Sequence, residues 1–150
     1  MSNELDNAIH ALQRDLIENH PVDAVQLLEK LAPGKVAELL LCHPITLTAQ
    51  VWERLSPDIS KRALETVSQQ QAIEVLRYIE PSRTATILSM HNADAQEEYL
   101  VQFPEAIAEE VRTILAYPPD CAESMMDPRV LHLRAETTVK EAIARIRTIR

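Results

Sequence analysis

Three glutamates in the last third of the chain have the residue type and spacing that could bind a metal ion. Glu105 and Glu109 are one helical turn apart, and Glu110 lies beside them. Carboxylates at this spacing can converge on a hard cation such as Mg²⁺, which takes one or two carboxylates and keeps several of its waters. The sequence therefore predicts a candidate Mg²⁺ site here, with a solvated acidic helix face as the alternative.

No other residues have the spacing of a catalytic or metal centre. The five histidines form no HExxH motif and no zinc-type grouping with cysteine; they are His10, His20, His43, His91 and His132. Cys42 beside His43 is the closest approach, and we interpret this pair as a helix end before Pro44. The single glycine leaves no glycine-rich phosphate loop. We therefore expect no enzymatic activity and no cofactor other than a possible Mg²⁺ ion.

The elements that position these residues are expected to be helices. The chain has 150 residues, 46% of them hydrophobic, with one Gly and one Phe against abundant Ala, Leu, Glu, Gln and Arg. Cys42 and Cys121 are far apart, and neither a signal peptide nor a membrane-length apolar run is present. The sequence predicts an all-α protein with reduced thiols and a cytoplasmic location.

Prolines divide the chain at a nearly constant interval. They occur at Pro21, Pro33, Pro44, Pro57, Pro81, Pro104 and Pro118, so that the two long gaps are each about twice the short ones. The missing divisions fall near residues 69 and 93, where Ser68-Gln69-Gln70 and Asn92-Ala93-Asp94 are turn or cap sequences. In Ser56-Pro57-Asp58 we expect an N-cap serine, a first-turn proline and a first-turn acid. Self-similarity at a fixed period predicts a repeat array.

Apolar residues at helical spacing predict which faces are buried. Leu5, Ile9, Leu12 and Leu16 predict a first helix over residues 3–18 with one buried face. Eight further stripes follow: Val25, Leu28, Leu31; Val36, Leu39, Leu40; Val51, Trp52, Leu55; Ile59, Ala63, Leu64, Val67; Ile73, Leu76, Ile79; Ile87, Leu88; Tyr99, Leu100, Phe103; and Ile107, Val111, Ile114, Leu115. Helices this short do not persist alone. They must stack, and we expect a right-handed, solenoid-like superhelix that presents a surface to a partner.

The net charge of −8 is concentrated in one segment. Residues 94–127 hold nine acidic residues and one arginine, whereas residues 129–150 hold six basic and two acidic residues. An acidic segment repels phosphate backbones and attracts cations or basic partners, so nucleic acid is not expected as a partner.

The pattern changes after Tyr117. Pro118-Pro119 predicts a stiff connector, residues 130–133 predict a short strand, and Thr138 with Glu141 forms a capping box for a helix over residues 139–149. One strand and one helix do not make a stable domain. The sequence therefore predicts a helical domain at 1–117, a linker at 118–128 and the truncated beginning of a second domain at 129–150.

Two segments carry a resemblance to a known family. Residues 115–128, LAYPPDCAESMMDP, resemble the junction L-x-Y-P-x-D-S-A-G-x-x-M-T-P that follows the N domain of MgtE-type magnesium transporters. Residues 137–147, TTVKEAIARIR, are similar to the T-V-x-E-A-I-x-x-I-R text that opens a CBS domain. The upstream helices with L-x-P punctuation resemble the superhelical N domain of the same family.

The resemblance implies a cytoplasmic regulatory region. In this family the N domain and paired CBS domains bind Mg²⁺ between acidic surfaces, and the pore closes when the ion is plentiful. The partners implied are the CBS domains and the membrane pore domain of a homodimeric parent protein, with no membrane insertion by these residues. Ser82, Arg83 and Thr86 stand where the family has aspartates in D-P-D-D-x-A-D-L-L. Two functions stay open: a Mg²⁺-sensing regulatory module, and a helical protein-interaction adaptor that senses no ion.

Overall fold

A computed structural model describes residues 2–117 and 137–148 of the chain. Every regular element in these two ranges is a helix: α1 Ser2–Asn19, α2 Pro21–Leu28, α3 Pro33–Leu41, α4 Ile45–Arg54, α5 Pro57–Leu64, α6 Gln69–Tyr78, α7 Pro81–Leu88, α8 Ala93–Leu100, α9 Glu105–Leu115 and α10 Val139–Thr148. The predicted all-α fold is confirmed for this part of the chain. The predicted linker at 118–128 and strand at 130–133 lie outside the described residues.

Helices α2 to α9 begin at a constant interval of twelve residues. Their first residues are 21, 33, 45, 57, 69, 81, 93 and 105. Proline occupies the first turn of α2, α3, α5 and α7 and precedes the first residue of α4 and α9. Proline is tolerated there because the first-turn N–H groups have no acceptor within the helix. The predicted period is therefore confirmed, including the two units that begin without proline.

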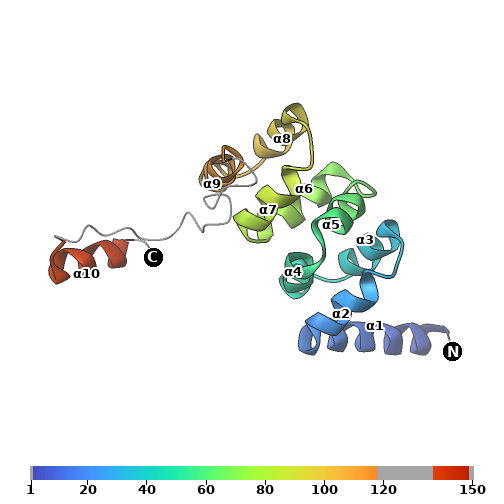
Figure 1. Cartoon of the computed structure of the whole chain (residues 1–150). Helices are drawn as coiled ribbons and strands as arrows, with labels where there is room; N and C mark the ends of the chain where they lie inside the picture. The colour runs from blue at the N-terminus through green and yellow to red at the C-terminus, as the bar shows by residue number, and fades with distance from the viewer. Residues whose placement is uncertain (1, 118–136, 149–150) are drawn as a thin grey trace.

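The helices stack in two rows. Helices α3, α5, α7 and α9 contact one another in sequence, and α2, α4 and α6 do the same, so most contacts within the stack join a helix to the one two further along the chain. Figure 1 shows the resulting array, with α1 at one end and α9 near the other. Short connections between successive helices are sufficient, because each unit buries its apolar face against its near neighbours alone.

Two positions in each twelve-residue unit build the core. The fourth residue of a helix is at most 1% exposed in seven of the eight units: Ala24, Val36, Thr48, Ser60, Ala72, Thr84 and Ala108. The eighth residue is buried Leu or Trp in α2 to α8: Leu28, Leu40, Trp52, Leu64, Leu76, Leu88 and Leu100. Small side chains at the fourth position let the helices approach closely, and the large eighth residues fill the space between them. Trp52 is fully buried, which confirms its expected place in the core.

The apolar face predicted for the first helix is not buried as expected. Ile9 is 43% exposed and Leu12 is 70% exposed, whereas Ile17, outside the predicted stripe, is buried. Helix α1 contacts α2 and α4, but it is the first element of the array, so no preceding unit covers its outer face. Leu31, predicted to be in the core, is also 41% exposed because it follows α2 at the same end of the stack.

The helix caps differ from the prediction at one place. Ser56 precedes α5, but its hydroxyl makes no capping hydrogen bond; its backbone N–H instead donates to Glu29 Oε1 at 2.8 Å. Ser68 and Asn92 do cap α6 and α8, accepting from the backbone N–H groups of Gln71 and Ala95. The predicted capping box of α10 is also present, since Glu141 N–H donates to Thr138 Oγ1 at 3.4 Å and Thr138 N–H donates to Glu141 Oε2 at 3.0 Å.

This difference gives a matched pair of substitutions. Ser68→Ala removes one side of a capping box that satisfies two N–H groups, and should cost about 1 kcal/mol of stability. Ser56→Ala removes a hydroxyl without a capping bond and should change stability by less than about 0.5 kcal/mol. Urea denaturation followed by circular dichroism measures both. Equal losses for the two variants would show that the capping bond at Ser68 does not stabilise α6.

Candidate functional site

The predicted metal ligands lie on α9, at the far end of the stack from α1. Glu105 is the first residue of α9, and Glu109 follows one turn later; both are exposed. Glu110 is half-buried, one position round the helix. The structure thus places Glu105 and Glu109 on one solvent-facing surface, as their spacing predicts, and turns Glu110 away from it by about 100°, the rotation per residue of an α-helix.

Arg112 lies among these carboxylates. Its Nη2 donates to Glu97 Oε1 of α8 at 2.7 Å, and its Nη1 is 3.9 Å from Glu105 Oε1. The hydrogen bond to Glu97, together with the charges of Glu97, Glu105 and Glu109, raises the pKa of the guanidinium. An arginine therefore supplies part of the positive charge that this acidic surface attracts, and a metal ion would share the carboxylates with it.

Arg112 was not predicted to be part of the site, although its place in the repeat is unusual. Arg112 is the eighth residue of α9, where helices α2 to α8 all carry Leu or Trp. The fourth residue of α8 is also exceptional: Gln96 is half-buried, and its Nε2 donates to the backbone oxygen of His91 at 2.9 Å. The two departures from the core pattern thus fall in the adjacent units that carry the acidic surface. Comparing the units with one another would have found both.

The residues at which the resemblance implies aspartates lie on α7. Ser82 and Thr86 are exposed, and Thr86 Oγ1 donates to the backbone oxygen of Ser82 at 2.9 Å. Arg83 is half-buried, and its Nε and Nη2 have no hydrogen-bond partner among the described residues. Burial lowers the pKa of Arg83, and the charge of Glu53 opposes this shift. This part of α7 thus presents hydroxyl groups and a cation, not carboxylates, and has no hard-cation donor set of its own.

No group of three or more His, Cys, Asp or Glu side chains in the described part of the chain is arranged to hold a metal ion. The carboxylates of α9 would need ligands from a second surface or from water to complete a coordination shell. A site shared between two surfaces is consistent with the exposure of Glu105 and Glu109.

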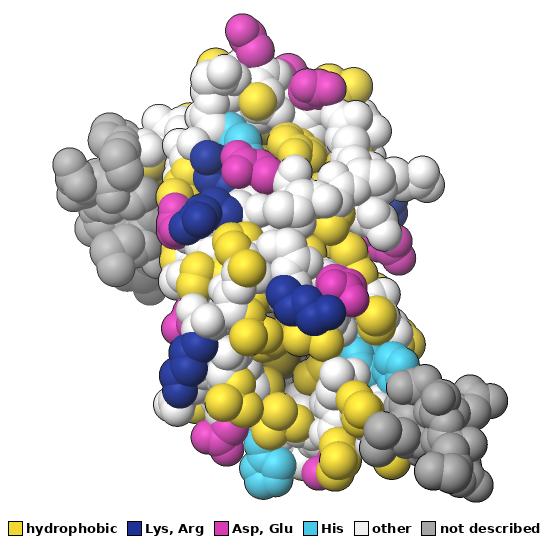
Figure 2. All heavy atoms as spheres, turned by 90° about the vertical axis from the view of Figure 1, so that its right-hand side faces the viewer, with side chains coloured by type: hydrophobic (Ala, Val, Ile, Leu, Met, Phe, Trp, Pro, Cys, Tyr) yellow, Lys and Arg dark blue, Asp and Glu magenta, His cyan; other side chains and the backbone are white. Residues whose placement is uncertain are grey.

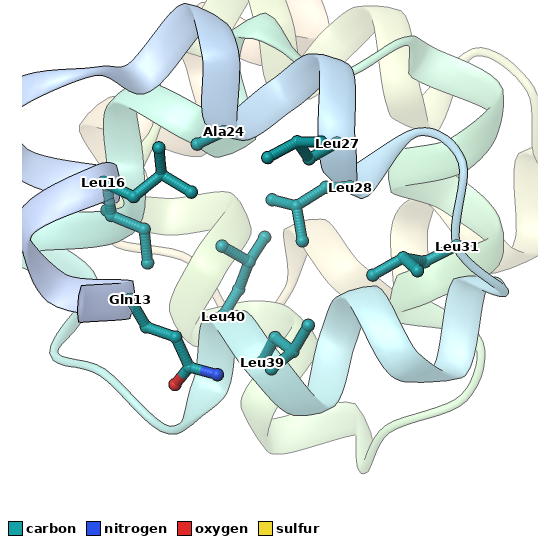
Figure 3. A pocket seen from close by; sticks show the side chains of 9 residues that line it. Gln13, Leu16, Ala24, Leu27, Leu28, Leu31, Leu39 and Leu40 are labelled. Carbon is teal, nitrogen blue, oxygen red and sulfur yellow. The ribbon is translucent and has the colours of Figure 1, made fainter. Parts of the chain in front are cut away.

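A second surface feature is an apolar hollow at the opposite end of the stack. It has a volume of about 140 Å³ and lies between α1, α2 and α3; Gln13 is its single polar lining residue. Figure 3 shows Leu16, Leu28, Leu39 and Leu40 pointing into it from the three helices. Figure 2 shows apolar side chains on the face that is turned to the viewer. The exposed apolar residues of α1 and α2 include Ile9, Leu12, Val22 and Leu27.

A regular two-row stack of short helices, with an acidic patch at one end and an apolar hollow at the other, defines a helical-repeat module. The family model of the MgtE intracellular N domain matches residues 19–120. This match covers more than half of the chain. The protein therefore belongs to the family of the MgtE intracellular N domain.

One of the matching solved structures shows the same fold. The cytosolic domain of the Mg²⁺ channel MgtE, crystallised in complex with ATP, matches with a TM-score of 0.72 and 23% identity, and the alignment covers 99% of this chain and 62% of that one. The soluble part of a magnesium transporter matches with a TM-score of 0.45 and 16% identity over 93% of this chain and 60% of that one. At these identities only the first match carries an argument, and it concerns the fold. No curated protein sequence matches the chain.

None of the helices in the described residues is both long enough and apolar enough to cross a membrane. The chain also spans 62% of the length of the cytosolic domain that it resembles.

Proposed function

We propose that this chain is the cytoplasmic regulatory module of an MgtE-like magnesium transporter, and that divalent cations regulate its packing against neighbouring CBS domains. The observation that carries the proposal is the family match over residues 19–120, supported by the fold shared with the cytosolic domain of a Mg²⁺ channel. In this proposal the domain division is 1–117 for the N domain, 118–128 for the linker and 129–150 for the start of a CBS domain.

In the proposed mechanism the cation acts on the acidic surface that is formed by Glu97 of α8 and by Glu105 and Glu109 of α9. Glu105 and Glu109 repel a second acidic surface when no cation is present, and a Mg²⁺ ion between the two surfaces would remove that repulsion and favour the packed state. Glu110 is the third proposed ligand. The ion can shift the packing only by the difference between its affinities for the packed and separated states.

A Mg²⁺ titration of thermal stability tests the proposal. Millimolar Mg²⁺ is expected to raise the melting temperature more than NaCl does at the same ionic strength, because a ligand that binds the folded state stabilises it by about 1.4 kcal/mol at ten times its Kd. For a domain of this size, each 1 kcal/mol raises the melting temperature by about 2–4 °C. Equal shifts from the two salts would indicate diffuse screening only and would contradict specific binding.

Two variants assign the response to residues. The double substitution Glu105→Gln and Glu109→Gln should remove the difference between Mg²⁺ and Na⁺. The matched control Glu74→Gln, an exposed glutamate on α6, should keep it. If the Mg²⁺ response survives in the double variant, the ion binds elsewhere and the assignment to α9 is wrong.

One observation favours the alternative function, a protein-interaction adaptor without ion sensing. On α7, Ser82, Arg83 and Thr86 stand where the resemblance implies acidic residues, so this helix offers a partner hydroxyl groups and a positive charge. An adaptor would show the same stabilisation by MgCl₂ and NaCl and would bind its partner equally well when divalent cations are chelated.

A further inference from the structure

A histidine replaces an apolar residue at the point where α1 meets the stack. The eleventh residue of a unit, counted from the first residue of its helix, is apolar in six of the eight units: Leu31, Leu55, Val67, Ile79, Phe103 and Leu115. The two exceptions are His43 and His91. An imidazole that must lose its charge to fit an apolar position can respond to pH.

His43 contacts a second histidine on α1. The ring centroids of His10 and His43 are 6.0 Å apart, and the ring planes are nearly perpendicular at 77°. His43 follows the C-terminal end of α3, so this contact ties the middle of α1 to the corner between α3 and α4. His43 Nε2 is buried and has no hydrogen-bond partner among the described residues. A neutral imidazole fits this position, whereas a protonated one would bury an N–H donor without an acceptor.

The charges around the pair are mixed, but the two that act on the pKa of His43 are positive. Helix α1 contributes Arg14 and Glu18, which form an ion pair at 3.6 Å and line a hollow beside His43. Helix α6 contributes Glu74, which lines a second hollow that His43 also lines. Burial lowers the pKa of His43, and the charges of His10 and Arg14 lower it further.

His91 provides the contrast within the same chain. Its ring packs against Tyr99 with centroids 5.9 Å apart, but its Nε2 lies 3.9 Å from Glu65 Oε1. His91 thus lies beside a carboxylate, whereas the charges that act on His43 are those of His10 and Arg14.

Few side chains of the first helix are buried. Among its described side chains, Ile17 is buried, Leu16 and Gln13 are half-buried, and the others are exposed. We propose that the contact between His10 and His43 is an acid-sensitive latch, and that protonation of His43 releases α1 from the stack. Release would uncover the apolar hollow between α2 and α3, because Leu16 and Ile17 form its α1 wall.

The direction of the pH effect follows from the difference in proton binding between the docked and released states of α1. A histidine whose pKa is lower in the docked state binds fewer protons there than in the released state, so docking is favoured at high pH. The contribution of His43 is complete above its ordinary pKa of 6.5 and is lost as the pH falls below that value towards the lowered pKa of the docked state.

Amide hydrogen exchange of the full chain at pH 7.5 and pH 5.5 tests the latch. Rates are expressed as protection factors relative to an unstructured chain at each pH. Protection of the α1 amides from residue 13 to residue 19 is expected to fall several-fold at pH 5.5, while protection in α5 and α6 stays constant. A uniform fall across all helices would mean general acid destabilisation and would overturn the proposal, as would constant protection in α1.

Three variants separate the latch from other titrating groups. His43→Leu restores the apolar residue found in other units, and should keep α1 protected at both pH values. His10→Gln should likewise reduce the response, whereas His91→Leu should leave it as in the unmodified chain. If α1 loses protection at pH 5.5 to the same extent in the His43→Leu and His10→Gln variants as in the unmodified chain, the histidine pair is not the latch. Trp52 emission, from a fully buried indole, verifies that each variant is folded.

Discussion

Trp52→Ala is expected to lower the free energy of unfolding by about 3–5 kcal/mol, the usual cost of truncating a buried large aromatic side chain. Trp52 is the eighth residue of α4, is 0% exposed, and belongs to the continuous core of the stack. Its removal leaves a void that the neighbouring backbones cannot close without shifting the helices on both sides. Urea denaturation followed by far-ultraviolet circular dichroism measures the loss.

The repeat supplies the control for this substitution. Leucine fills the same position in α2, α3, α5, α6, α7 and α8. Trp52→Leu should therefore be tolerated better than Trp52→Ala, and it also removes an indole N–H that has no hydrogen-bond partner among the described residues. Equal losses for the two variants would show that the cost does not come from the volume of the side chain.

Ala72→Leu is expected to destabilise the chain by about 1–3 kcal/mol through overpacking. Ala72 is the fourth residue of α6 and is fully buried, at the position that is at most 1% exposed in seven of the eight units. Three extra carbon atoms there would force α6 away from the helices that it contacts. The measurement is the midpoint of thermal unfolding.

Gln96→Leu is the matched control at the same position of another unit. Gln96 is the fourth residue of α8 but is half-buried and already has a long side chain. Leucine should therefore fit there with a change below about 0.5 kcal/mol beyond the loss of the hydrogen bond to His91. A loss at Gln96 equal to that at Ala72 would contradict the view that the fourth position is a close-packing point.

The sequence allowed the helix boundaries to be predicted better than their packing. Proline at Pro57 or Pro81 restricts the local backbone so strongly that it identifies a helix start without tertiary information. Among the fourth-position residues Val36 was predicted to be buried, but Thr48, Ser60 and Thr84 were missed because they are polar and look like surface residues in a single helix. Thr84 is accommodated because its hydroxyl donates to the backbone oxygen of Leu76 at 2.7 Å, a contact between units that local patterns do not contain.

For the acidic site, too, the local geometry could be predicted from the sequence but the contacts between helices could not. The spacing of Glu105 and Glu109 places them on one face of a helix, because that geometry is local. The ion pair between Arg112 and Glu97 joins residues fifteen positions apart, so it depends on how α9 lies beside α8. The apolar residues of α1 show the opposite error: Leu12 satisfies the helical pattern, but its exposure is set by the position of α1 at the end of the array.

The twelve-residue interval also determines how a local change can reach distant parts of the molecule. Contacts run mainly between alternate helices, through α9, α7, α5 and α3 along one row and through α6, α4 and α2 along the other. Such an array behaves nearly as a one-dimensional chain of coupled units, in which each unit influences only its neighbours. The structural effect of a change in charge at α9 would therefore weaken at each unit before it reached α1. The acidic surface of α9 and the histidine latch of α1 would then respond to cations and to pH almost independently of each other.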